Sequence, residues 1–357
     1  MDDNPYRAPD GGAQPASVES ILARIDAGSD LSLDETAAAV DGIMLGQWTE
    51  CQIADFLLGL RKKSETVEEI AGAATAMRRH MTPIRTRRTD VVDTCGTGGN
   101  ASGIFNVSTS AALVAAAAGA TVAKHGNRRV TSKSGSADVL TELGVNVQAD
   151  INCVSGCLDE LGLCFCFAPL CHAAMKHVAP VRQRLAVPTI FNLLGPLTNP
   201  ASAPYQLLGV GRDELRPMLA AVLARLGTKR AAVVHGSDGL GEISIAAETR
   251  VTEVRDGRLA EVTWSPADFG IQASSLNELR VEGPADSAEM IRKVLAGHRG
   301  SRRDIVVVNA AAVLWLVGKA ESLASAAQLA CHAIDSRAAA NLLDKLVQRT
   351  RAPSFAD

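Results

Sequence analysis

The sequence predicts an α/β protein in which a small helical N-terminal domain precedes a large α/β domain with a central, mostly parallel sheet. Residues 17–81 show apolar residues at helical spacing, interrupted by short polar breaks. Beyond residue 90, short β-type runs alternate with helical patterns, which is the order typical of an α/β domain. The chain has 357 residues, of which 47% are hydrophobic, and this length is sufficient for two such domains.

The first domain is expected to be a compact bundle of helices. Its helices are predicted over residues 17–27, 32–45, 50–60 and 66–80. Ser32 is followed three residues later by Glu35, and Thr49 in the same way by Gln52, so both pairs fit capping boxes at helix starts. The short connections predict close packing of neighbouring helices. Residues 1–16, rich in Asp, Pro and Gly, are expected to form a disordered tail.

The larger domain is expected over residues 90–350, after a linker over residues 81–90 that contains Pro83 and three arginines. Its predicted strands are short apolar runs at residues 89–92, 120–123, 162–168, 231–235, 249–254 and 304–309. An alanine-rich run over residues 110–120 predicts a helix between the first two strands. Strand, glycine loop, helix and strand together predict a right-handed βαβ unit, whose ligands bind at the carboxyl ends of its strands.

Three polar segments of this unit carry chemistry that binds phosphate. Within 36 residues the chain contains DTCGTGGN at 93–100, NVST at 106–109 and KHGNR at 124–128. Glycines allow backbone N–H groups to approach an anion, and a helix N-terminus adds free N–H groups and partial positive charge. The loop lacks the G-x-G-x-x-G of a dinucleotide fingerprint and the G-K-[ST] of a P-loop. These segments therefore predict a site for a phosphorylated substrate of another kind.

Composition and charge exclude several classes of protein. The formal net charge is −3, from 36 basic and 39 acidic side chains, which argues against a nucleic-acid-binding protein. No apolar run reaches about 18 residues without a break, so no membrane span is expected. The first residues show no basic region followed by an apolar one, so no signal peptide is expected either. We therefore expect a cytoplasmic protein.

The cysteines are interpreted as packing residues. The chain has eight, and five of them gather near His172, at positions 153, 157, 164, 166 and 171. Their spacing does not match paired C-x₂-C zinc knuckles. Cys164 and Cys166 lie in an apolar run that predicts a buried strand, where a free cysteine behaves as a small hydrophobic residue. Structural disulfides are not expected in a reducing cytosol.

Long segments of the chain resemble anthranilate phosphoribosyltransferases. The matching segments are GTGGN, NVST, KHGNRRVTSKSGSADVLTELGVN, HAAMKHVAPVRQRL, IFNLLGPLTNPA and HGSDGLGEIS, in the family's order and spacing, over roughly residues 17 to 350. The resemblance implies transfer of the phosphoribosyl group of phosphoribosyl pyrophosphate (PRPP) to anthranilate in tryptophan biosynthesis, with Mg²⁺ as cofactor, in one or two ions. It also implies the fold related to pyrimidine nucleoside phosphorylases. A return segment near residues 177–197 would complete the helical domain, which would mediate a homodimer.

The resemblance also assigns the site residues. PRPP would be bound by Gly96, Gly98, Gly99, Asn100, Asn106, Ser108, Thr109, Lys124 and Ser136. Anthranilate would be bound by Gly96, Asn127, His172 and Arg182, with His125 at its entrance and Gly195-Pro196 in the pocket wall. Mg²⁺ would be held by Ser108 and Glu242. The planar fork of Arg182 suits a carboxylate, and no covalent nucleophile is expected.

The chain departs from the family pattern chiefly at two acids. The glycine loop ends in Asn100 where the family usually has Asp, and Gly241 stands where a metal-binding Asp is expected beside Glu242. The loss of a carboxylate predicts a weaker second metal site or a single metal, because Mg²⁺ prefers carboxylates and water. Asp238, three residues away, is a candidate replacement. Smaller differences are Ala173 in place of Pro and the Val187-Pro188 step.

Two other functions remain open from the sequence. The missing Asp is compatible with a catalytically weakened paralogue that acts as a binding protein, including a nucleic-acid-binding one, although such a protein would be expected to carry a basic surface. A pyrimidine nucleoside phosphorylase would share the architecture but differs in the loop motif KHGNRRVTSKSGSAD. The expected partners are anthranilate, PRPP and a second copy of the chain, with neither nucleic acid nor membrane.

Overall fold

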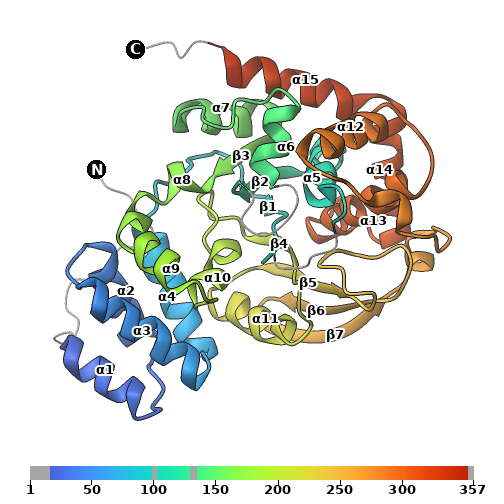
Figure 1. Cartoon of the computed structure of the whole chain (residues 1–357). Coiled ribbons are helices and arrows are strands. Elements are labelled where there is room, and N and C mark those ends of the chain that lie inside the picture. Colours follow the sequence, from blue (N-terminus) through green and yellow to red (C-terminus); the bar gives the residue numbers. More distant parts are fainter. Residues whose placement is uncertain (1–16, 99–102, 129–134, 353–357) are drawn as a thin grey trace.

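The computed structural model describes residues 17–98, 103–128 and 135–352, and its centre is a seven-stranded sheet in the order β3-β2-β1-β4-β5-β6-β7 (Figure 1). The strands are β1 Val91–Asp93, β2 Thr121–Gly126, β3 Leu163–Phe167, β4 Tyr205–Gly209, β5 Arg230–Gly236, β6 Thr249–Arg255 and β7 Arg258–Trp264. Neighbours from β3 to β5 pair in parallel, whereas β5–β6 and β6–β7 are antiparallel. The predicted mostly parallel sheet is confirmed.

The order of the strands creates a topological switch point between β1 and β4. From β1 the chain proceeds to β2 and β3 on one side, and then returns to β4 on the other. Helices that connect parallel strands on opposite sides of such a point leave a crevice at the carboxyl ends of the strands. Asp93 lies opposite Gln206 in the β1–β4 register, and an isolated bridge joins Gly96 to Gly209 just beyond it. The glycine loop therefore begins at the switch point.

Helices cover both faces of the sheet. Those of the α/β part are α5 Val107–Ala117, α6 Ser136–Glu142, α7 Ile151–Leu161, α11 Leu215–Arg225, α12 Pro284–Leu295, α13 Ser301–Leu316, α14 Leu323–Asp335 and α15 Ala338–Arg351. Alternate residues of β4 and β5 face opposite cores, as expected for a strand. Leu207 and Val234 belong to the core with α5 and α13, whereas Leu208 and Val233 belong to the core with α11.

The helical part contains α1 Val18–Asp26, α2 Leu33–Met44, α3 Glu50–Lys63 and α4 Val67–Arg79, close to the predicted ranges (Figure 1). The capping boxes predicted at Ser32 and Thr49 are confirmed, and Thr66 forms a third with Glu69. Of these helices, α4 packs against α11 of the α/β part, and both contribute to one continuous core. The helical part is therefore anchored on one face of the sheet.

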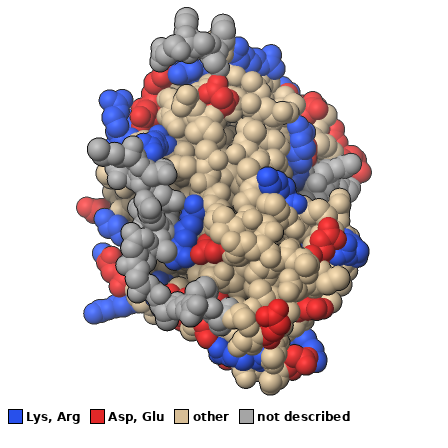
Figure 2. Space-filling model, turned by 90° about the vertical axis from the view of Figure 1, so that its left-hand side faces the viewer, with Lys and Arg blue, Asp and Glu red and all other residues tan. Residues whose placement is uncertain are grey.

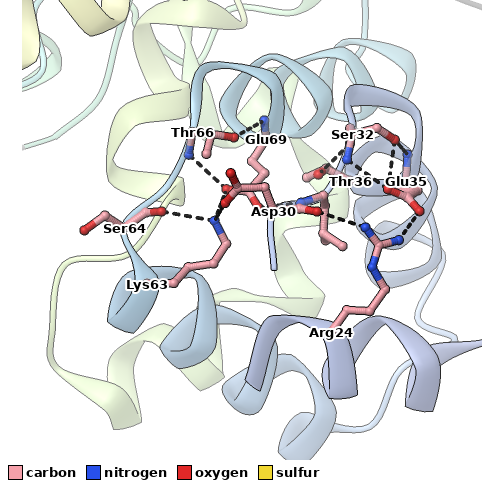
Figure 3. Close-up of polar contacts among 10 residues, drawn as sticks. Arg24, Asp30, Ser32, Glu35, Thr36, Lys63, Ser64, Thr66 and Glu69 are labelled. Carbon is pink, nitrogen blue, oxygen red and sulfur yellow. Dashed lines mark hydrogen bonds and ion pairs between the residues drawn. The ribbon is translucent and has the colours of Figure 1, made fainter. Parts of the chain in front are cut away.

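A buried carboxylate joins the loops of the helical part (Figure 3). Glu69 is fully buried and accepts hydrogen bonds from the backbone N–H groups of Leu31 and Thr66, each at 2.9 Å, and from Lys63 Nζ at 2.8 Å. Lys63 also binds Asp30 at 2.8 Å. Burial alone would lower the pKa of Lys63, but the hydrogen bonds and charges of Asp30 and Glu69 outweigh it and raise this pKa. The network ties the α1–α2 and α3–α4 connections together.

A later segment packs against these helices. It contains α8 Ala168–Cys171, the 3₁₀ turn η1 Ala173–His177, α9 Ala179–Leu185, α10 Phe191–Leu194 and the 3₁₀ turn η2 Gly195–Leu197. Helix α9 lies against α3, and α10 lies against α4. Val181 and Leu194 are fully buried in the same core as Phe56 and Leu60. The completion of the helical domain by residues 177–197 stays a prediction, which this packing supports.

The strand predicted at residues 304–309 is wrong, because these residues form part of α13. The run Ile305–Val308 is β-branched, but the apolar sequence continues to Leu316 and is buried almost all round. A β-branched residue costs a helix at most about 0.7 kcal/mol, whereas its burial contributes about 1.5–3 kcal/mol. Strands β4 and β7 were not predicted.

Among the described residues no helix is long and apolar enough to cross a membrane.

Candidate functional site

The glycine loop after β1 is fixed to the end of β4 by its backbone. Thr97 N–H donates to Gly209 O at 2.9 Å, and Gly209 N–H donates to Cys95 O at 3.2 Å. A Cβ atom on Gly96 would lie 2.9 Å from Gly209 O, so only glycine allows this approach. Gly98 has a positive φ of +67°, which also favours glycine. Of the predicted PRPP residues, Gly99 and Asn100 lie outside the described residues.

Helix α5 points its N-terminus toward the same edge of the sheet. Asn106 is its N-cap, and its Oδ1 accepts the Thr109 N–H at 3.1 Å. The hydroxyl of Thr109 is buried and has no hydrogen-bond partner among the described residues. An unpartnered buried hydroxyl is costly, so Thr109 leaves a polar group unused beside the start of the helix.

Lys124, near the end of β2, is buried under the glycine loop. Its ammonium donates to Thr94 O at 2.7 Å, to Ser108 Oγ at 3.0 Å and to Thr94 Oγ1 at 3.5 Å. Only 3% of the residue is exposed. Burial lowers the pKa of Lys124, although the negative charges of Asp93 and Glu242 oppose the shift. The loop, α5 and β2 are thus joined around one cation.

The loop between β5 and β6 brings Glu242 to this cation. Glu242 is half-buried, and its carboxylate makes no hydrogen bond within the described residues. Burial raises the pKa of Glu242 to about 7, and the nearby charge of Lys124 opposes this rise. Glu242, Ser108, Gly209 and Asn309 line a small cavity of about 10 Å³. This volume is about that of one water molecule or ion.

The neighbouring acid, Asp238, is used elsewhere. Its carboxylate accepts hydrogen bonds from Ser244 Oγ and from the Leu240 N–H within its own turn. It does not line the cavity that Glu242 and Ser108 share. The structure therefore does not bring Asp238 into the position that Gly241 leaves without a carboxylate.

Two histidines meet where β2 approaches the later segment. His125 Nδ1 lies 2.9 Å from Gly195 O, and its Nε2 lies 3.2 Å from His172 Nε2. Burial lowers the pKa of His125, and burial together with the charge of His125 lowers that of His172 to about 3. Both rings are therefore neutral near pH 7, and Gly195 lies against them.

Asp93 lies beside this pair. Its Oδ1 accepts the His125 backbone N–H at 3.1 Å, and its buried Oδ2 has no partner among the described residues.

The remaining predicted residues are half-buried, as Arg182 and Ser136 are, or exposed, as Asn127 is. Arg182 of α9 donates to Asn192 Oδ1 at 3.4 Å and lies 5.9 Å from the ring of Phe191, but pairs with no carboxylate of the described residues. Burial lowers the pKa of Arg182. Asn127 is exposed, and its carbonyl accepts the Ser136 hydroxyl at 3.4 Å. Arg182 thus has its fork available for a ligand.

Sequence reasoning missed several residues that line the cavity, among them Gly209 and Asn309. Gly209 ends β4, and Asn309 lies in the middle of α13. Neither belongs to a motif, and each reaches the cavity only through the tertiary fold, so no local signal could have identified them.

The clustered cysteines are buried free thiols. Cys164 and Cys166 lie in β3 with their sulfur atoms 3.8 Å apart. Burial raises the pKa of Cys157 and of Cys171 to about 12, so these thiols are protonated and unreactive near neutral pH. In the described part of the chain no three His, Cys, Asp or Glu side chains group as a metal site.

Comparison with known families defines the class of protein. Residues 19–81 match the model of the glycosyl transferase family, helical bundle domain, and residues 88–340 match that of its a/b domain. The chain is thus a two-part glycosyl transferase, and Figure 1 shows its helical part and its α/β part.

The closer relatives identify the family within this class. The anthranilate phosphoribosyltransferase of Rhodopirellula baltica is 48% identical over 332 residues, which cover 93% of this chain and 97% of the relative. That of Thioalkalivibrio sulfidiphilus is 49% identical, over 94% of this chain and 98% of the relative. The chain belongs to the anthranilate phosphoribosyltransferase family.

The fold of the chain is similar to that of solved structures from this family. The anthranilate phosphoribosyltransferase of Thermus thermophilus has a TM-score of 0.87 and 39% identity, over 93% of this chain and 99% of its own. The Saccharomyces cerevisiae enzyme in complex with PRPP and Mg has a TM-score of 0.85 and 28% identity, over 94% of this chain and 98% of its own.

Proposed function

We propose that this protein transfers the phosphoribosyl group of PRPP to the amine of anthranilate, giving N-(5-phosphoribosyl)anthranilate and pyrophosphate, in tryptophan biosynthesis. One observation carries the proposal beyond family membership. At the switch point, the glycine loop, the N-terminus of α5 and the ammonium of Lys124 converge within hydrogen-bonding distance. Such a cluster of backbone N–H groups and positive charge suits a pyrophosphate.

The reaction forms a bond between the anthranilate nitrogen and the anomeric carbon while the bond to pyrophosphate breaks. Positive charge develops on the ribose and negative charge on the leaving group, and the amine loses a proton. The protein has to align both substrates, stabilise the leaving group and exclude water. In our proposal the glycine loop, Asn106, Ser108 and Thr109 hold the phosphates. No side chain has to form a covalent bond.

We propose that the anthranilate side is formed by Arg182, Asn127 and the His125–His172 pair. The guanidinium of Arg182 has no carboxylate partner among the described residues, which supports a role in binding the carboxylate of anthranilate in a bidentate manner. Neutral histidines beside Gly195 offer a buried wall without a second positive charge.

We propose Mg²⁺ as the cofactor, since the yeast relative was solved with PRPP and Mg. The donor set fits this ion: Ser108 Oγ and the unpartnered carboxylate of Glu242 line one cavity, and Mg²⁺ prefers oxygen ligands. Bound Mg²⁺ would neutralise the charge of the departing pyrophosphate. Because Gly241 offers no carboxylate, we propose that the second of two ions is held weakly.

A homodimer is also proposed, formed through the helical part. Figure 2 shows the side of the molecule on which this part lies, and much of its centre carries uncharged side chains. Leu45, Leu58 and Leu170, at the end of α2, in α3 and in α8, expose 59%, 41% and 39% of their surface. Sedimentation velocity would test this, because a species of one chain at micromolar concentration would contradict it. The expected cytoplasmic location stays a prediction.

Loss of anthranilate fluorescence, with pyrophosphate release followed in parallel, tests the reaction. We expect consumption that requires both PRPP and Mg²⁺. A folded protein that consumes no anthranilate at any Mg²⁺ concentration would contradict the proposal.

A further inference from the structure

The loop that carries Glu242 is held by a side chain from a distant helix. Asn309 of α13 is 1% exposed, and its Oδ1 accepts the Ile243 N–H at 3.0 Å. Its Nδ2 donates to Ile243 O at 3.0 Å and to Ile305 O at 2.8 Å. Both N–H groups of the carboxamide are therefore used. One side chain gives Ile243 the pair of hydrogen bonds that a neighbouring strand would give.

The other flank of Glu242 is fixed by close backbone packing. A Cβ atom on Gly209 would lie 1.8 Å from Gly241 O, so the carbonyl of Gly241 rests directly against the end of β4. The residue before Glu242 is thus held by the sheet, and the residue after it by α13. Gly209 and Asn309 both line the cavity that contains Glu242 and Ser108.

The backbone that holds Glu242 is more important in this chain than it would be in a chain with a second metal-binding acid at position 241. Gly241 has no carboxylate, and the Glu242 carboxylate makes no hydrogen bond within the described residues. The direction of the Glu242 side chain is therefore determined mainly by the backbone of residues 241–243. Groups that orient a metal ligand from behind typically change metal affinity by about 10–100-fold when they are removed.

We propose that Asn309 is a positioning residue for the Mg²⁺–pyrophosphate site, acting by holding the Glu242 backbone in place beside Ser108 and Lys124. This inference rests on the proposed function, because it assumes that Glu242 binds a metal with PRPP. Asn309 itself need not touch either substrate.

The test compares Asn309→Leu, which keeps the branched shape and removes all three hydrogen bonds, with Asn309→Ala, which leaves room for water. The matched control is Thr350→Val in α15. Thr350 Oγ1 likewise accepts a backbone N–H from a distant segment, that of Asn146 at 3.1 Å, and lies away from the cavity. Two quantities are measured: amide hydrogen exchange over residues 239–246, and Mn²⁺ affinity in the presence of PRPP by electron paramagnetic resonance.

We expect both Asn309 variants to exchange the 239–246 amides about tenfold faster, since one net hydrogen bond is worth about a factor of ten in opening. Mn²⁺ affinity should fall about tenfold or more. Thr350→Val should change neither quantity, whatever its melting temperature. The same two readouts on Asn309→Ala decide the question if Asn309→Leu does not fold.

Unchanged Mn²⁺ affinity in a folded Asn309 variant would overturn the inference, as would an equal fall in Thr350→Val. A wild-type protein that binds no Mn²⁺ with PRPP would instead contradict the proposed function. The exchange data, which need no ligand, separate these two failures.

Discussion

The α/β side and the helical side of the site differ in how their cations are held. On the α/β side, the Lys124 ammonium already makes contacts with Thr94 and Ser108, and the glycine loop is tied to Gly209. On the helical side, Arg182 makes one long hydrogen bond and no ion pair within the described residues. The α/β side therefore holds its cation through the protein itself, whereas the guanidinium of the helical side is open to a ligand. In our proposal the first side binds PRPP and the second binds anthranilate.

Removing the cation of the α/β side gives the largest expected effect. Lys124→Met would leave Asp93 and Glu242 without their nearby positive charge, and would remove the ammonium that joins the loop to α5. We expect kcat/KM to fall by about 100-fold or more. The KM for PRPP should rise, whereas the KM for anthranilate should stay nearly unchanged. Steady-state kinetics with each substrate varied would measure this. An equal rise in both KM values would break the distinction between the two sides.

A clash at the switch point should destabilise the α/β side. The added Cβ of Gly209→Ala would meet the Gly241 carbonyl at 1.8 Å, so backbone has to move. We expect a loss of about 1–3 kcal/mol in the free energy of unfolding, measured by urea denaturation. Gly195→Ala is the control, because a Cβ there would meet nothing within 4 Å. Equal stability of the two variants would show that this edge is not closely packed.

The stability of the protein should depend on pH through His172, which lies at the border between the two sides. The pKa of His172 is lowered from 6.5 to about 3, so the unfolded chain binds more protons than the folded protein between these values. The neutral His172 ring therefore does not reduce the free energy of unfolding above pH 6.5, and this free energy falls as the pH drops from 6.5 toward 3. We expect a loss of about 1.4 kcal/mol per pH unit in this range. His172→Gln should show a shallower slope in urea denaturation at pH 6 and below, and an unchanged slope would contradict the assignment.

Restoring the missing acid should give the smallest effect. Gly241 is not among the glycines with positive φ, so Asp fits its backbone. We expect Gly241→Asp to lower the Mg²⁺ concentration for half-maximal activity by about tenfold, as one charge-assisted ligand is worth about 1.5 kcal/mol or more. An unchanged Mg²⁺ titration would show that this position does not reach the metal.

The same two sides explain what the sequence could predict. GTGG, NVST and KHGN lie close together along the chain, so their chemistry and the helix that follows NVST could be interpreted locally. Gly209 and Asn309 reach the cavity only because β4 and α13 pack beside β1 and α5. Asn309 also ends the run that was predicted as a strand, and only in a helix does its side chain reach both Ile305 and the loop.

Arg182→Met provides the most direct test of the central claim that the two halves serve different substrates. The KM for anthranilate and the KM for PRPP should be measured with this variant and with wild type. We expect the KM for anthranilate to rise about tenfold or more, as loss of a charged hydrogen-bonding partner costs about 1.5–3 kcal/mol, while the KM for PRPP stays within about twofold. An unchanged KM for anthranilate, or an equal rise for PRPP, would contradict the assignment of the helical side to anthranilate.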